Sequence, residues 1–287
     1  MNFEAISGAA AVAVAGSFVF ALIARSGLAL SRSRTAAGRF AASIMPEAAQ
    51  RFRDQLEVLR RKQWILLAAA GVFAILFPFA YVLAPAARFH GLAVWQLVLA
   101  AACLVSAGGL AGTRLVRGLL AKRRLEFVRD ANIAVGQGLH KLTGNLNRVF
   151  HEVPCGAGVI DSVMAGLHGI YAIYVIAHRP GRHNRVRAQG EQLLFAPGRH
   201  RIGLTPYAEQ SNLLERQLKK ALKLPLKVRT VIAVPGWEIE EQSGDNRLVV
   251  NERSLTMLRG WKDSDEYLMN EDVERLHALL TERCMRG

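Results

Sequence analysis

The stretch from Arg148 to His178 constrains the fold of this chain more than any other part of it. It holds three runs of β-branched and aromatic residues, separated by glycines: 149–153, 159–165 and 170–177. Short apolar runs divided by glycine are typical of antiparallel strands joined by tight turns. One acid, Asp161, lies inside the second run, where burying a carboxylate is costly unless the protein uses it. The sequence therefore predicts three strands and makes Asp161 the first candidate functional residue.

The first 112 residues hold most of the apolar excess of a chain that is 51% hydrophobic. Three segments approach the 20 or so apolar residues that cross a bilayer: about 5–24, 64–84 and 92–112. A signal peptide is the alternative for the first segment, but it lacks a positive start and its apolar run is too long. The pattern predicts three transmembrane helices.

The charges around these segments predict their orientation. Residues 25–63 carry nine Lys and Arg, the 85–91 connection carries one, and residues 113–124 carry five. The positive-inside rule then places the C-terminal part in the cytoplasm and the N-terminus outside, as in a multi-pass inner-membrane protein. A charged amphipathic helix, about 46–63, is expected at the cytoplasmic surface. None of the spans carries a charge, which argues for an anchor in the lipid bilayer and against a transport pathway.

The elements expected after residue 125 are those of one small domain. Helical patterns cover 130–142, 205–224 and 273–283, strand patterns cover 228–234 and 248–250, and an Arg- and His-rich loop covers 179–201. Thr205 is expected to be the N-cap of the second helix, since Pro206 suits its first position. The predicted fold is a membrane region of three transmembrane helices (1–125), followed by a small α/β domain with a mixed sheet (126–287).

This layout resembles the nuclease-related domain (NERD) family of the PD-(D/E)xK endonuclease-like superfamily. The resemblance covers most of residues 130–280. It rests on seven groups of residues: Val135 and Leu139, Val149–Val153, Ile160-Asp161, Gly169–Ile173, Thr205-Pro206 with Gln210, Leu218, and the strand pattern 228–234. It implies a restriction-endonuclease-like fold. It also implies a site in which a strand Asp and Glu bind Mg²⁺ while a Lys activates water, as in metal-assisted hydrolysis.

The departures from the family pattern lie at the catalytic positions. Asp161 and Gln210 are present, but Tyr174 stands at the expected Glu and Ile176 at the expected Lys. Asn132 stands at the expected early-helix Glu, and Ser162 replaces a histidine. A lone carboxylate is a weak Mg²⁺ site, so the resemblance implies a degenerate nuclease that needs no cofactor. A site rebuilt with a migrated group, from among His168, His178, Glu191 and Lys219, is the alternative.

The positive charge of the domain is concentrated in residues 179–229, which carry 12 Lys and Arg against 3 acids. Such a block attracts phosphate backbones without reading sequence. The candidate nucleic-acid-binding residues are Arg182, Arg185, Arg187, Lys219, Lys220 and Lys223. Contact with anionic lipid headgroups is the alternative, and the acidic segment 230–287 is a possible intramolecular partner.

Three hypotheses about function follow. The first is a membrane-anchored, catalytically degenerate nuclease-related domain that binds nucleic acid or a protein partner. The second is a membrane-tethered, Mg²⁺-dependent nuclease with a site rearranged around Asp161. The third is a structural or assembly module that forms homo-oligomers or binds a protein. Three cysteines without paired spacing exclude a disulfide framework and a structural zinc site.

Overall fold

A computed structural model describes residues 47–83, 94–144, 146–156, 158–179, 184–196, 200–241, 247–259 and 268–286. The chain divides into two compact units. Residues 55–83 and 94–124 belong to the first unit. Residues 47–54 join residues 125–286 in the second, so the described part of the first unit lies in sequence between two parts of the second.

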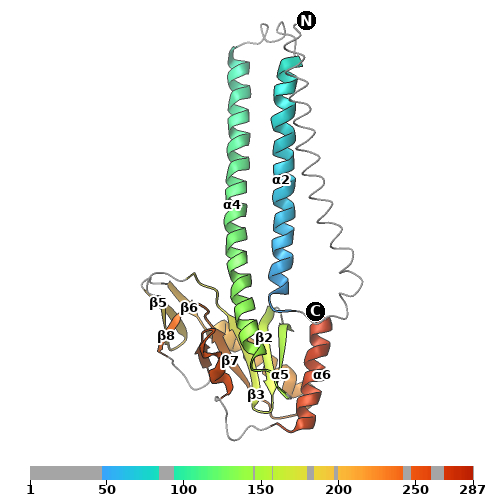
Figure 1. Ribbon diagram of the computed structural model, residues 1–287, viewed down its shortest axis with the longest axis vertical. Coiled ribbons are helices and arrows are strands. Elements are labelled where there is room, and N and C mark those ends of the chain that lie inside the picture. The colour runs from blue at the N-terminus through green and yellow to red at the C-terminus, as the bar shows by residue number, and fades with distance from the viewer. Residues whose placement is uncertain are drawn as a thin grey trace. The chain divides into compact units, whose positions relative to one another are not determined.

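The described residues of the first unit belong to two long helices, α2 (Gln50–Leu83) and α4 (Val94–His140). Residues 50–54 of α2 and 125–140 of α4 belong to the second unit. Figure 1 shows the two helices running side by side, and the side chain of Gln63 lies against Gly118. The sequence analysis predicted separate elements here: an amphipathic helix over 46–63, spans over 64–84 and 92–112, and a further helix over 130–142. The structure instead joins the charged and the apolar turns into two continuous helices.

The membrane prediction requires correction. Among the residues that the structure describes, no helix combines the length and the apolar character that a bilayer crossing requires. The three-span membrane region and the multi-pass inner-membrane location are therefore wrong. The predicted first span, 5–24, lies outside the described residues.

The second unit is built on a five-stranded mixed sheet in the order β1-β2-β3-β7-β9. Its strands are β1 (Arg148–Cys155), β2 (Gly158–Gly166), β3 (Gly169–Val175), β7 (Val228–Ala233) and β9 (Arg247–Val250). The first three pair antiparallel, whereas β7 pairs parallel with both β3 and β9. The glycine-punctuated runs of the sequence therefore form one half of this sheet.

A second sheet corrects the prediction of a single mixed sheet and a loop over 179–201. Its order is β6-β5-β4-β8, with strands β4 (Arg185–Gln189), β5 (Gln192–Ala196), β6 (His200–Gly203) and β8 (Glu238–Glu241). Val186 and Ala188 alternate with exposed residues along β4, and Leu193 and Phe195 are buried on β5. Alternation of this kind produces a half-buried strand even where arginine occupies the exposed positions.

The five-stranded sheet has a buried core on each face. On one face, Phe150, Ile160 and Ile232 pack with the second sheet and with two helices, α5 (Thr205–Leu222) and α6 (Asn270–Arg286). On the other face, Met164 and Ile173 pack with the last turns of α4 and with a 3-10 helix, η2 (Ser254–Arg259). Because both faces are covered, the strands are apolar almost throughout.

Helix α5 begins differently from the prediction. Its N-cap is Leu204, which makes no side-chain capping bond, and Pro206 lies in its first turn. Thr205 is the first helical residue and donates its hydroxyl to Glu191 at 2.7 Å. The helix ends at Lys223, in a left-handed conformation (φ 56°), whose N–H bonds to the Lys219 carbonyl at 2.9 Å. This is an αL cap of the kind that glycine usually makes.

Candidate functional site

Asp161 lies on β2, where β2 and β3 part. The pairing of these strands ends at Ser162 and Ile173. The Asp161 carboxylate then accepts the backbone N–H of Val175 through Oδ2 at 2.8 Å. Its Oδ1 faces the Arg51 guanidinium at 3.3 Å. Burial raises the pKa of Asp161, while the Val175 N–H and Arg51 act in the opposite direction. Both oxygens of this carboxylate therefore have a partner inside the protein.

A second carboxylate, which the sequence analysis missed, belongs to Glu152 on β1. Glu152 and Asp161 lie between the same two ladder pairs, His151–Ser162 and Val153–Ile160, one on each strand. Glu152 has a φ of 54°, a conformation that only glycine adopts without cost. Its Oε1 accepts the backbone N–H of Arg51 at 2.8 Å, and burial raises its pKa.

These contacts bring three groups together: Arg51 in the first turn of α2, Glu152 on β1 and Asp161 on β2. Sequence reasoning assigned Arg51 to a surface helix and gave Glu152 no role. A signal for Glu152 was available, since it is an acid within an apolar strand, as Asp161 is. No pattern pointed to Arg51, because more than 100 residues separate it from both carboxylates.

The remaining positions implied by the family resemblance do not complete a metal site. Tyr174 is 2% exposed, its hydroxyl lies 3.2 Å from Ser211 Oγ, and its ring packs 5.0 Å from that of Tyr207. Ser211 also accepts a bond from Thr230 at 2.9 Å. Burial raises the pKa of Tyr174, so the phenol stays neutral. A buried hydroxyl network thus occupies the place of the expected Glu.

Three other residues implied by the resemblance have contacts of their own. Ile176 is 7% exposed and belongs to the core. Asn132, on α4, donates its amide to the Val128 carbonyl at 2.9 Å. The Gln210 amide packs against Gly158 at the start of β2. In the described part of the chain, no three His, Cys, Asp or Glu side chains form a group that could hold a metal ion.

The four residues that could have supplied a migrated group to a rebuilt site also lie in other surroundings. His178 stacks on His200 with ring centroids 4.6 Å apart, and its carbonyl accepts the Trp237 indole N–H at 2.7 Å. Glu191 bonds Thr205 and Arg247, and Lys219 pairs with Glu215. His168 lies in the turn between β2 and β3 and lines a pocket described below.

The predicted nucleic-acid-binding residues separate into two groups. Arg185 and Arg187 on β4 form cross-strand ion pairs with Glu240 on β8. On α5, Lys219 pairs with Glu215 at 2.8 Å, whereas the exposed Lys220 and Lys223 have no ion-pair partner among the described residues. Arg182 lies outside the described residues. The end of α5 is therefore the least neutralised part of the predicted basic surface.

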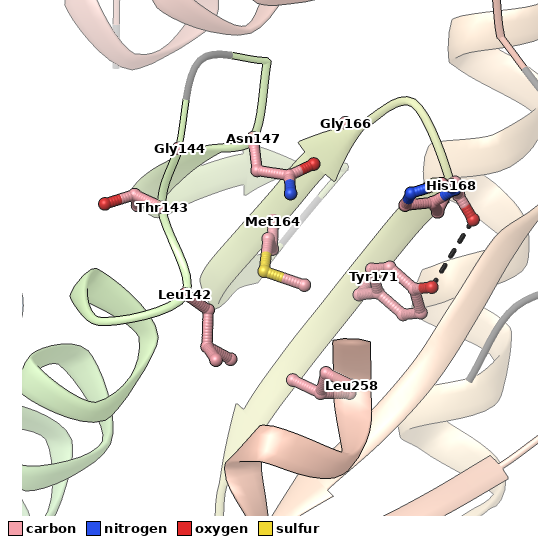
Figure 2. A pocket seen from close by; sticks show the side chains of 10 residues that line it. Leu142, Thr143, Gly144, Asn147, Met164, Gly166, His168, Tyr171 and Leu258 are labelled. Atoms are coloured by element: carbon pink, nitrogen blue, oxygen red, sulfur yellow. Dashed lines mark hydrogen bonds between the residues drawn. The ribbon is translucent and has the colours of Figure 1, made fainter. Parts of the chain in front are cut away.

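A hollow of about 290 Å³ lies at the end of the sheet opposite to Asp161 along β2. Figure 2 shows the side chains of Leu142, Met164 and Leu258 converging on it, with Asn147 and His168 at its edge. The Tyr171 hydroxyl donates to the His168 carbonyl at 3.4 Å. None of the residues that line this pocket is Asp, Glu, Lys or Arg. It is separate from the carboxylates.

Gly166, beside this pocket, is predicted to tolerate no side chain. A Cβ there would lie 1.7 Å from Asn147 Oδ1 and 3.3 Å from the Asn147 Cα, so Asn147 must move. We expect Gly166→Ala to lower the free energy of unfolding by about 1–3 kcal/mol, as overpacking does. Urea denaturation measures this. Gly144→Ala is the control, because nothing lies within 4 Å of its Cβ, and an equal loss in both variants would contradict the packing argument.

Comparisons with family models, with curated proteins and with solved structures found no match to this chain.

Proposed function

We propose that the second unit is a nuclease-related domain that has lost hydrolysis and acts by binding nucleic acid. This proposal rests on Asp161. Both oxygens of its carboxylate already have partners, the Val175 N–H and the Arg51 guanidinium. Mg²⁺ prefers several oxygen ligands in octahedral geometry. The residues present do not fit that ion, since Tyr174 and Ile176 are buried where a second carboxylate and a lysine are expected.

The end of α5 is the surface that supports binding. Lys220 and Lys223 are exposed there, next to Lys219, and the domain's basic block extends from 179 to 229. Lysines on one surface attract phosphates of any sequence, and binding releases counterions. The ion pairs of Arg185 and Arg187 with Glu240 make the β4 surface a weaker candidate.

Charge reversal on α5 tests this surface. We expect Lys220→Glu with Lys223→Glu to lower the affinity for double-stranded DNA at least tenfold at about 100 mM salt. Because two phosphate contacts are lost, the slope of log K against log salt should fall by roughly two. Fluorescence anisotropy of labelled DNA with the full chain measures both.

The control for this experiment reverses two exposed arginines elsewhere in the second unit, Arg253→Glu and Arg275→Glu. Its total charge equals that of the lysine variant, so only the position of the charges differs. Equal losses in both variants would mean that net charge, not the α5 surface, attracts DNA. No measurable DNA affinity in the unmodified chain would contradict the proposed function and favour a protein partner.

One observation favours a second candidate, a metal-dependent nuclease rearranged around Asp161. Glu152 places a second carboxylate beside Asp161, and the charge of Asp161 acts to raise the pKa of Glu152. In this alternative the missing strand carboxylate is supplied by β1. Arg51 opposes it, because its guanidinium faces Asp161 where a cation would bind.

A further inference from the structure

Residues 47–54 belong to the second unit, although residues 55–124, which follow them in sequence, belong to the first. They contact the sheet through Arg51 at two points. The backbone N–H of Arg51 donates to Glu152 at 2.8 Å, and its guanidinium faces Asp161 at 3.3 Å. The segment thus covers the only two acids of β1 and β2.

The Arg51 contact has the features of a displaceable one. Its 3.3 Å separation is longer than the 2.7–2.9 Å of a strong guanidinium–carboxylate bond. The Arg51 side chain is 36% exposed, so it can leave without unfolding the domain. Glu152, whose carboxylate accepts the Arg51 N–H, has a left-handed backbone conformation (φ 54°) that costs energy in a non-glycine residue.

The carboxylates behind Arg51 favour a cation in its place. The side chain of Asp161 is only 16% exposed, so water screens its charge poorly. A partly buried carboxylate that loses its positive neighbour is left with an uncompensated desolvation cost. A guanidinium suits the position, since its planar fork of donors can bond two carboxylates together.

We propose that residues 47–54 are a displaceable lock, in which Arg51 occupies the Glu152–Asp161 pair until an arginine-bearing segment of a protein partner replaces it. The lock controls access to a recognition site for a guanidinium group. It does not rest on nucleic-acid binding by α5, which the lysine variants test separately.

A glycine on α4 offers a way to open the lock without altering either carboxylate. A Cβ at Gly136 would lie 2.7 Å from the Ala48 Cβ, so one of the two must shift, and we expect Gly136→Ala to displace the segment. Alanine also has a higher helix propensity than glycine, so α4 itself should not be weakened. Arg51→Ala opens the site in a second way, by removing the guanidinium alone.

The test uses the full chain and propylguanidinium at millimolar concentration as the probe. We expect this ion to raise the thermal midpoint of Arg51→Ala and of Gly136→Ala by at least 2 °C. The unmodified chain and Gly144→Ala should not respond, because their site is occupied. Propylammonium, at the same concentration and charge, should have less than half the effect, since it lacks the planar fork of donors.

Three outcomes would overturn the proposal. They are an equal response of the unmodified chain, an equal effect of propylammonium or Mg²⁺, and a response that persists when Asp161→Asn is combined with Gly136→Ala. If Arg51→Ala does not fold, Gly136→Ala alone decides the test. A specific response would be followed by anisotropy of an arginine-bearing peptide, with its arginine-to-alanine counterpart as control. Failure of the first peptide to bind the Gly136→Ala chain more tightly than the second would also overturn the proposal.

Discussion

Replacing Asp161 by alanine should lower the free energy of unfolding by about 3 kcal/mol. The loss has two physical sources. The backbone N–H of Val175 loses the acceptor that it has at 2.8 Å, and the Arg51 guanidinium loses its counter-charge at 3.3 Å. Because Asp161 bonds β3 where the β2–β3 pairing ends, both strands should loosen at that point. Urea denaturation of the full chain, followed by circular dichroism, measures the loss.

Asp161→Asn separates the two sources. Asparagine retains an oxygen that can accept the Val175 N–H, but it has no charge for Arg51. We expect Asp161→Asn to lower the free energy of unfolding by about 1 kcal/mol, which is what a partly exposed ion pair contributes. A catalytic carboxylate is often held at a cost to stability, so its removal can be neutral or stabilising. An Asp161→Ala protein as stable as the unmodified chain would therefore contradict a structural role for this residue.

Acidification should destabilise the second unit through His151. This side chain is 7% exposed, its Nδ1 lies 2.9 Å from Ser162 Oγ, and burial lowers its pKa from 6.5 to about 4. Repulsion from His140 adds to the effect, and Glu47 opposes it. Below pH 6.5 the unfolded chain binds a proton that the folded chain does not. Stability is therefore lost as the pH falls from 6.5 to about 4, by about 3 kcal/mol in total.

His151→Asn isolates this contribution. An asparagine amide can replace Nδ1 as the partner of Ser162, but it does not titrate. We expect the variant to be less stable at pH 7, because the ring volume is lost, and to lose less stability between pH 6.5 and 4. The raised pKa values of Asp161 and Glu152 act in the opposite direction and are common to both proteins. Identical pH profiles would mean that His151 is not the titrating group.

The sequence predicted the elements whose apolar pattern is regular. The runs 149–153, 159–165 and 170–177 are the centres of β1, β2 and β3, and α5 begins one residue earlier than predicted. Glycine and proline mark the ends of these elements for steric reasons, so single-sequence reasoning can find them. The second sheet was missed because exposed arginines dominate β4, although Val186 and Ala188 alternate with them.

Long-range contacts account for the rest of what the sequence could not predict. The apolar and charged turns of α2 and α4 were predicted as separate elements, because the residue composition changes along each helix. The helical backbone, however, continues through both kinds of turn. The contact of Arg51 with Glu152 and Asp161 joins residues more than 100 positions apart. Local periodicity holds no information about such a contact. That Tyr174 and Ile176 stand where the resemblance implies Glu and Lys, by contrast, can be read directly from the sequence.

The most direct test of the account measures, in one experiment, whether the chain cleaves nucleic acid and whether it retains it. The full chain is incubated with single- and double-stranded DNA and RNA, with Mg²⁺, Mn²⁺ or a chelator. The account predicts retention of nucleic acid in all three conditions, without cleavage, in the unmodified chain and in Asp161→Asn alike. Metal-dependent cleavage that Asp161→Asn abolishes would contradict it and would make Asp161 and Glu152 part of an active nuclease site.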